Sequence, residues 1–157
     1  MKKIIILCSF LLSFYMLAAQ DVAQETQTRK AVENFLVAFG ESNPDKIATF
    51  VAENVDWYIF ESKIFPWTGI RTKRSEIPEV FKTLFSYFFP GKEKVTIDAL
   101  LIDGKDAALF LKLGRQFKHS GKNFTMFAAI HFHVDNGLID KFYLYEQTPV
   151  LEKAFKK

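Results

Sequence analysis

The chain has 157 residues, a formal net charge of +3, 18 phenylalanines and a single cysteine. This length suits one domain with a real core and is too short for two, and the nearly balanced charge excludes an overall field that would favour nucleic acid or an anionic membrane. So many aromatic residues in a small domain indicate a wide apolar interior, a large subunit contact, or both.

Residues 1–19 have the pattern of a signal peptide. A positive start at Lys2-Lys3 precedes the uncharged residues 4–17, and small residues end at Ala19. The apolar run is shorter than the roughly 20 residues of a spanning helix, so we expect cleavage after Ala19 and no retained membrane anchor. We therefore expect one mature domain at 20–157, in the periplasm or secreted, without a cysteine to form a disulfide or bind a metal.

Three helices are predicted before the main run of strands. Residues 21–39 place apolar side chains at helical spacing, and Gly40 follows where a left-handed terminal residue belongs. Asn43-Pro44 predicts a capped second helix that ends near Ala52. Ser75 is expected to cap a third helix, whose apolar stripe is the cleanest amphipathic pattern in the chain. The stripe consists of Ile77, Val80, Phe81, Leu84, Phe85 and Phe88.

The remaining elements are predicted to be strands. Residues 55–61 are rich in β-formers and give a first strand, which a loop at 62–74 follows. From residue 91 onward the alternating pattern predicts a four-stranded meander. Its turns are Asp103-Gly104, Ser120-Gly121 and Asn136-Gly137.

The last two strands of the meander indicate the shape of the domain. Asn136-Gly137 suits a type I′ turn, so 122–135 and 138–147 should pair as antiparallel neighbours. On 122–135 one face is wholly apolar, and the other bears aromatic, polar and histidine side chains. Such long strands curl strongly. We therefore expect an α+β fold: a curved antiparallel meander covered by about three N-terminal helices, cone-shaped with a central pocket.

Several ordered motifs support the same arrangement. They are FLVAFGESNPDKIATFVAENVDWY at 35–58, Pro66-Trp67-Thr68-Gly69, Ile77, Asp135-Asn136-Gly137-Leu138-Ile139 and Tyr145. This order resembles the SnoaL-like branch of the nuclear transport factor 2-like superfamily over about residues 28–147. The resemblance implies the cone fold and a central pocket for a small molecule.

Ketosteroid isomerases of this superfamily use an aspartate base, with a tyrosine and a protonated aspartate as oxyanion donors. The resemblance places Phe35 at the tyrosine, Ile59 at the base and Ile130 at the protonated aspartate. All of these residues are apolar, so neither a general base nor oxyanion donors are expected at these positions. Ketosteroid isomerisation is therefore not the expected activity.

Glu61, Arg115 and Glu146 are the ionisable residues expected to point inward near strand ends. A carboxylate in an apolar cavity can have a raised pKa and act as an acid or base. The alternative is that these groups lie at the wet rim of the cavity, without a catalytic role.

The pocket wall is predicted from strand parity, helical spacing and the resemblance together. It consists of Phe35, Trp57, Ile59, Trp67, Phe81, Phe85, Leu111, Ile130, Phe132, Phe142 and Leu144. Such a wall indicates a binding protein for a small apolar molecule, with no cofactor and no assignable catalytic set. One alternative is an isomerase, cyclase or dehydratase that uses a pocket carboxylate. Another is a module for oligomerisation or protein interaction.

The opposite face of the sheet predicts a homodimer. Its members are Phe127, His131, His133, Tyr143 and Tyr145. This set is too apolar for a face left open to water. A metal site at His131-x-His133 is not expected, because zinc needs a third ligand and the remaining histidine lies in a turn.

Overall fold

The computed structural model describes the backbone of residues 2–157 and the side chains of residues 21–157. Within this range the elements are α1 (Lys2–Gly40), α2 (Pro44–Ala48), β1 (Val51–Ile59), β2 (Gly69–Lys73), η1 (Arg74–Glu76), α3 (Ile77–Ser86), β3 (Lys94–Asp103), β4 (Asp106–Gln116), β5 (Asn123–Asp135), β6 (Leu138–Glu146) and α4 (Thr148–Phe155). The predicted signal peptide at 1–19 lies outside the residues whose side chains are described, so its cleavage stays a prediction.

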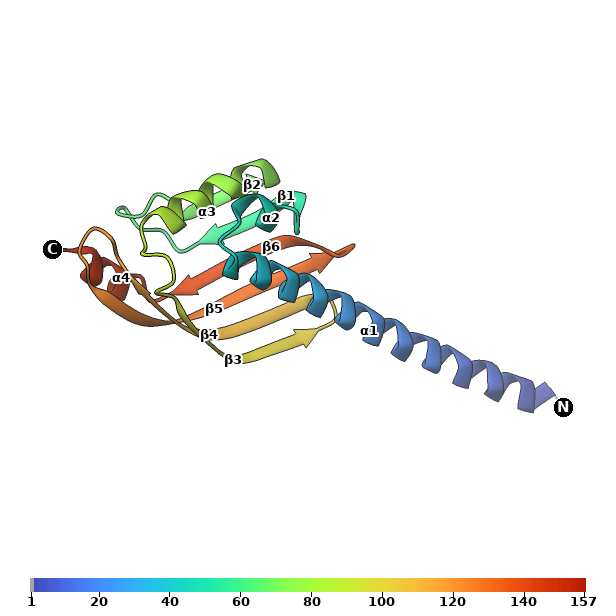
Figure 1. Cartoon of the computed structure of the whole chain (residues 1–157). Coiled ribbons are helices and arrows are strands. Elements are labelled where there is room, and N and C mark those ends of the chain that lie inside the picture. Colours follow the sequence, from blue (N-terminus) through green and yellow to red (C-terminus); the bar gives the residue numbers. More distant parts are fainter. Residues whose placement is uncertain (1) are drawn as a thin grey trace.

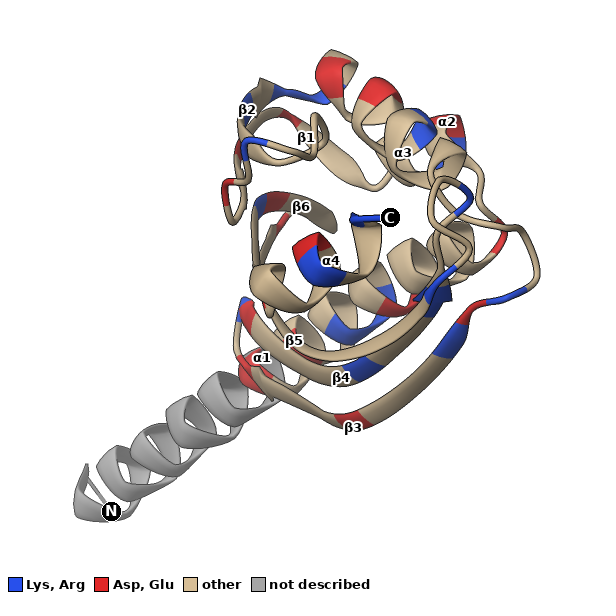
Figure 2. Ribbon diagram, turned by 90° about the vertical axis from the view of Figure 1, so that its left-hand side faces the viewer, with Lys and Arg blue, Asp and Glu red and all other residues tan. Residues whose placement is uncertain are grey.

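The strands between residues 51 and 146 form one sheet in the order β2-β1-β6-β5-β4-β3. Neighbouring strands are antiparallel except β1 and β6, which run parallel. Helices α1 and α3 cover one face of the sheet (Figure 1). Figure 2 shows β3 and β4 curving around the interior. The predicted α+β cone, a curved sheet covered by N-terminal helices, is confirmed, and the sheet is curled but not closed.

The meander follows from its turns and its alternating side chains. Asn136 and Gly137 have φ of 50° and 77°, as the predicted hairpin requires. On β5 the apolar side chains from Phe124 to Val134 face the core, while Phe127 and its outer neighbours face away. Parity along β5 was therefore predicted correctly. The curvature comes with irregular registers in β3 at residues 97–99 and in the β5–β6 pair at residues 133–134.

The helices differ from the predictions at their ends. The positive φ after α1 belongs to Ser42, not to Gly40. Asn43 caps α2 as predicted, since its Oδ1 accepts the backbone N–H of Lys46 at 3.0 Å. Helix α2 ends at Ala48 rather than near Ala52, because Val51 already belongs to β1 and pairs with β6.

The segment predicted as a loop at 62–74 contains a further strand. Strand β2 pairs antiparallel with β1 and passes into η1 and α3. The predicted cap at Ser75 is wrong. Instead, a carboxylate oxygen of Glu76 accepts the backbone N–H groups of Thr72 and Lys73, each at 2.9 Å. These hydrogen bonds stabilise the ionised form of the carboxyl group. They hold the pKa of Glu76 below its ordinary value, and the bond from Thr72 makes the largest contribution.

Aromatic rings form much of the core between the sheet and the helices. Trp57 of β1 stacks on Phe142 of β6 with ring centroids 3.8 Å apart, and Phe35 of α1 packs against both rings. A second cluster around Phe65 and Phe117 packs against α4 through Phe155. Among the described residues, no helix is long and apolar enough to cross a membrane.

Candidate ligand-binding site

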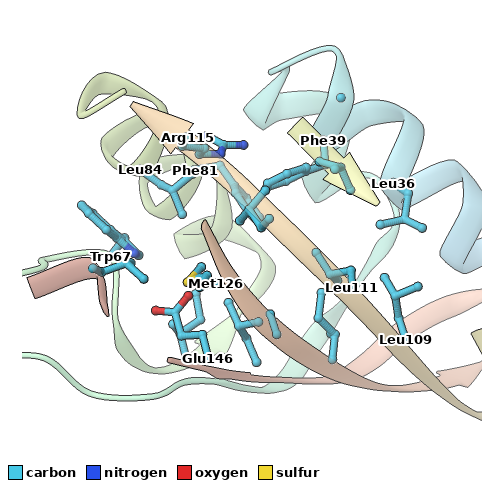
Figure 3. Close-up of a pocket in the computed structure, with 18 of the residues that line it drawn as sticks. Leu36, Phe39, Trp67, Phe81, Leu84, Leu109, Leu111, Arg115, Met126 and Glu146 are labelled. Atoms are coloured by element: carbon cyan, nitrogen blue, oxygen red, sulfur yellow. The ribbon is translucent and has the colours of Figure 1, made fainter. Parts of the chain in front are cut away.

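An apolar cavity of about 260 Å³ lies between the inner face of the sheet and helices α1 and α3. This volume lies slightly below the lower end of ligand sites, roughly 300 Å³. Val95 and Ile97 of the edge strand β3 line it and are each 53% exposed. The cavity therefore opens to solvent along β3. Figure 3 shows side chains from α1, α3 and the strands converging on it.

Most of the predicted wall lines this cavity. The residues that do so are Phe35, Ile59, Trp67, Phe81, Leu111, Ile130, Phe142 and Leu144. Three predicted wall residues do not. Trp57 and Phe132 are fully buried in the core behind Phe35 and Phe142, where other rings cover them. Phe85 stacks on Phe81 and packs against Arg115 instead of reaching the cavity.

Several lining residues were missed by the sequence reasoning. They are Leu36, Phe39, Gly40, Leu84, Phe88, Val95, Ile97, Leu109, Leu113, Phe124, Met126, Ala128 and Leu151. For many of them, the alternation of side chains along the strands already indicated an inward position. Leu109 and Leu113 share the face of Leu111, and Met126 and Ala128 share the face of Ile130. The contribution of Leu151 depends on how α4 docks, which no local pattern indicates.

Phe35, Ile59 and Ile130 all line the cavity. These are the positions at which the resemblance places the ketosteroid isomerase residues. Here they supply apolar surface, which neither accepts a proton nor donates a hydrogen bond.

Arg115 lies at one side of the cavity and is only 4% exposed. Its guanidinium carbon lies 5.2, 5.7 and 5.1 Å from the ring centres of Phe39, Phe85 and Phe88. Nε and one Nη are buried and have no hydrogen-bond partner among the described residues. Burial lowers the pKa of Arg115 from its ordinary value, and the charge of Glu93 opposes this in part. A guanidinium nevertheless stays protonated in proteins, so Arg115 is a buried cation.

Glu146, at the end of β6, is the other ionisable residue among those that line the cavity. Figure 3 shows it apart from Arg115, on a different side of the cavity. Its Oε1 is buried and has no hydrogen-bond partner among the described residues. Burial raises the pKa of Glu146 to about 7. The carboxyl group therefore changes charge near neutral pH.

Glu61 does not reach the cavity, and the prediction that it points inward is wrong. Strand β1 ends at Ile59, so the alternation that would have turned Glu61 inward stops before it. The residue is exposed and borders a shallow surface hollow with Ser62 and Lys63. Arg115 and Glu146 are thus the predicted ionisable candidates that the fold brings to the cavity.

The outer face of the sheet carries aromatic rings and paired polar groups. Phe127 is 57% exposed and Tyr145 is 48% exposed. His131 hydrogen bonds to Asp106 at 2.6 Å. His133 forms a similar hydrogen bond with Asp140, and the hydroxyl of Tyr143 donates a hydrogen bond to Asp56. Among the described residues, no group of three or more histidine, cysteine or acidic side chains is placed to hold a metal ion.

The fold and the cavity together define a pocket-containing α+β protein. Residues 32–142 match the SnoaL-like domain family. The chain therefore belongs to the SnoaL-like family. No curated protein matches the chain.

Solved structures share this fold at low sequence identity. An NTF2-like protein from Burkholderia thailandensis E264 is 21% identical, with a TM-score of 0.72 over 83% of this chain and 98% of that one. TerC, co-crystallised with polyporic acid, is 12% identical, with a TM-score of 0.73 over 83% and 99%. An LEH-like epoxide hydrolase from M. tuberculosis is 16% identical, with a TM-score of 0.61 over 83% and 90%. At these identities the likeness shows the fold alone.

Proposed function

We propose that the protein is an exported binding protein for a small, largely apolar molecule. The observation that carries this proposal is the cavity, whose apolar wall is open to solvent beside Val95 and Ile97. Apolar surface that stays open to water costs free energy, and a ligand that covers it recovers that cost. TerC, which has the same fold, was co-crystallised with polyporic acid, and this fits a ligand-binding use of the fold.

The binding proposal is tested with a neutral fluorescent probe, N-phenyl-1-naphthylamine, whose emission rises in apolar surroundings. We expect saturable binding to the purified protein and a loss of about tenfold or more in Ile130→Trp, because the indole occupies the cavity that Ile130 lines. A real void accepts this volume, so the free energy of unfolding should change by less than about 1 kcal/mol. The matched control is Ile70→Trp, since Ile70 is exposed on β2, away from the cavity.

Two results would contradict the binding proposal. One is that the wild-type protein takes up no probe. The other is that Ile130→Trp unfolds the domain by several kcal/mol, as overpacking of a filled core does.

The proposal of export rests on the sequence of residues 1–19. Material recovered from the periplasm or the medium of the source cells should begin near Gln20 when its N-terminus is sequenced. A chain that still begins with Met1 would overturn this part of the proposal.

A second candidate function is an isomerase, cyclase or dehydratase that uses Glu146. The observation in its favour is a carboxyl group in an apolar cavity with a pKa of about 7, which suits a general acid or base at neutral pH. Native mass spectrometry of protein from its own host identifies the bound compound. An enzyme converts this compound in solution, and Glu146→Gln should bind it without converting it. A pure binding protein releases it unchanged.

We also propose that the outer sheet face forms a homodimer through Phe127, His131, His133, Tyr143 and Tyr145. The exposure of Phe127 and Tyr145, with the neighbouring Phe110 also exposed, gives a patch that a second copy of this face could cover. Light scattering should give twice the chain mass, and Phe127→Lys should give a monomer. A wild-type monomer that binds another protein through this face would instead support an interaction module.

A further inference from the structure

The cavity contains a cation without an anionic partner in contact. Arg115 is almost completely buried, and its Nε and one Nη lack hydrogen-bond partners among the described residues. Glu93 attracts it only from a distance, since no hydrogen bond or ion pair joins the described atoms of these residues. Burying an unpaired charge is strongly unfavourable. The rings of Phe39, Phe85 and Phe88 offset part of this cost through cation–π contacts.

The position of Arg115 suggests that stability is not the reason for its presence. It continues the inward-facing row Leu109, Leu111 and Leu113 on β4, where an apolar side chain would fit the pattern. Replacing buried charges by apolar residues of similar volume is often neutral or stabilising. A buried arginine with free donors at the wall of an open cavity instead has the properties of a ligand-binding group.

Charge and donor geometry indicate what would bind there. A guanidinium presents a planar fork of N–H donors that matches a carboxylate, and this charge-assisted pair is about twice as strong as a neutral hydrogen bond. The rest of the wall is apolar apart from Glu146, so the remainder of the ligand must be apolar as well. The cavity of about 260 Å³ limits the ligand to a small molecule.

We propose that the cavity binds a small amphipathic carboxylate, whose anionic group pairs with Arg115 and whose aromatic or branched body lies against the apolar wall. This inference rests on the proposed binding function, because it specifies the ligand class of the same cavity. Glu146 lies on another side of the cavity in Figure 3, so the apolar body lies between the two ionisable groups.

The test uses competitors of one ring system that differ in charge. N-phenyl-1-naphthylamine first establishes that the cavity takes up an apolar molecule. It is then displaced at pH 6 by 2-naphthoate, by the isosteric neutral 2-naphthamide, and by 2-naphthylmethylammonium. We expect 2-naphthoate to bind at least about tenfold more tightly than the amide, as a charge-assisted pair in a buried site allows.

The matched variants are Arg115→Met and Lys112→Met. Both remove one positive charge from β4, but Lys112 is exposed on the outer face, with its Nζ over the ring of Phe127. We expect the preference for the carboxylate to disappear in Arg115→Met and to persist in Lys112→Met. If Arg115→Met does not fold, Arg115→Gln tests the same loss of charge with a polar side chain.

The outcomes separate this inference from the proposed function. If the neutral probe binds but the carboxylate does not exceed the amide, the inference is overturned and the binding function stands. A preference that survives in Arg115→Met, or a preference for the ammonium compound, also overturns it. If the neutral probe itself does not bind, the proposed function fails, and the inference fails with it.

Discussion

Glu146 gives the cavity a measurable effect on the stability of the whole domain. Glu146 is half-buried at the end of β6 with its Oε1 buried, and this burial raises its pKa from 4.5 to about 7. Between these values the folded protein keeps a proton that the unfolded chain has released. Folding then binds a proton, so the stability of the domain falls as pH rises from 4.5 to about 7 and changes little above that through this group.

The magnitude follows from the same pKa values. One pKa unit corresponds to about 1.4 kcal/mol, so a rise from 4.5 to about 7 corresponds to about 3 kcal/mol. Glu146→Gln keeps the shape of the side chain and cannot ionise. We expect it to increase the free energy of unfolding by less than about 1 kcal/mol at pH 5 and by about 3 kcal/mol at pH 8.

Urea denaturation of both proteins at pH 5 and pH 8, at one protein concentration, measures this difference. Glu79→Gln is the matched control, because it removes an exposed carboxylate from α3 outside the cavity. The control should not stabilise the domain more at pH 8 than at pH 5. An equal effect of Glu146→Gln at both pH values would refute the reasoning, since Glu146 would then be ionised in the folded state as easily as in the unfolded chain.

Two further predictions concern Arg115 and the turn between β5 and β6. Arg115→Met should leave the free energy of unfolding unchanged or raise it by about 1–3 kcal/mol, because it removes a buried unpaired cation. A loss of several kcal/mol in urea denaturation would show that the cation–π contacts of Arg115 hold the fold together. Gly137→Ala should cost about 1–2 kcal/mol, because Gly137 has a φ of 77° that a residue with a Cβ adopts only under strain. Thermal unfolding measures this cost if the variant keeps the secondary structure of the wild-type protein. An unchanged unfolding midpoint would argue against strain at this turn.

The parts of the fold that depend on local patterns were predictable from the sequence. Alternation along β5 gave the correct inner face, and the geometry of Asn136-Gly137 gave the hairpin. Strand β2 was missed because Arg71, Thr72 and Lys73 form a short polar edge strand without a buried face. The parallel pairing of β1 with β6 joins distant segments, and no local pattern indicates it.

The candidate site was likewise predictable where it depends on local sequence patterns. Parity identified the side of the sheet on which the cavity lies, and it placed Arg115 and Glu146 there. It did not distinguish the wall of a cavity from the packed core behind it, as Trp57 and Phe132 show. That distinction depends on how closely the helices approach the sheet. Glu61 was placed wrongly because the end of a strand is set by its partners rather than by its own residues.

The parallel pair of β1 and β6 has a consequence for the order in which the domain folds. Asp56 and Tyr143 are 87 positions apart in the chain, yet their side chains are hydrogen bonded at the centre of this pairing. As hydrogen-bonded strands, β1 and β2 therefore pair only with each other until β6 has been synthesised, and an isolated two-stranded hairpin is at best marginally stable in water. The long loop between β1 and β6 must close, at a cost in conformational entropy, before contacts between these strands stabilise it. This requirement slows folding. A nascent chain that stops before Leu138 should thus carry β1 and β2 in an unfolded, protease-sensitive state, and the N-terminal part of the domain becomes stable only when nearly the whole sequence is present.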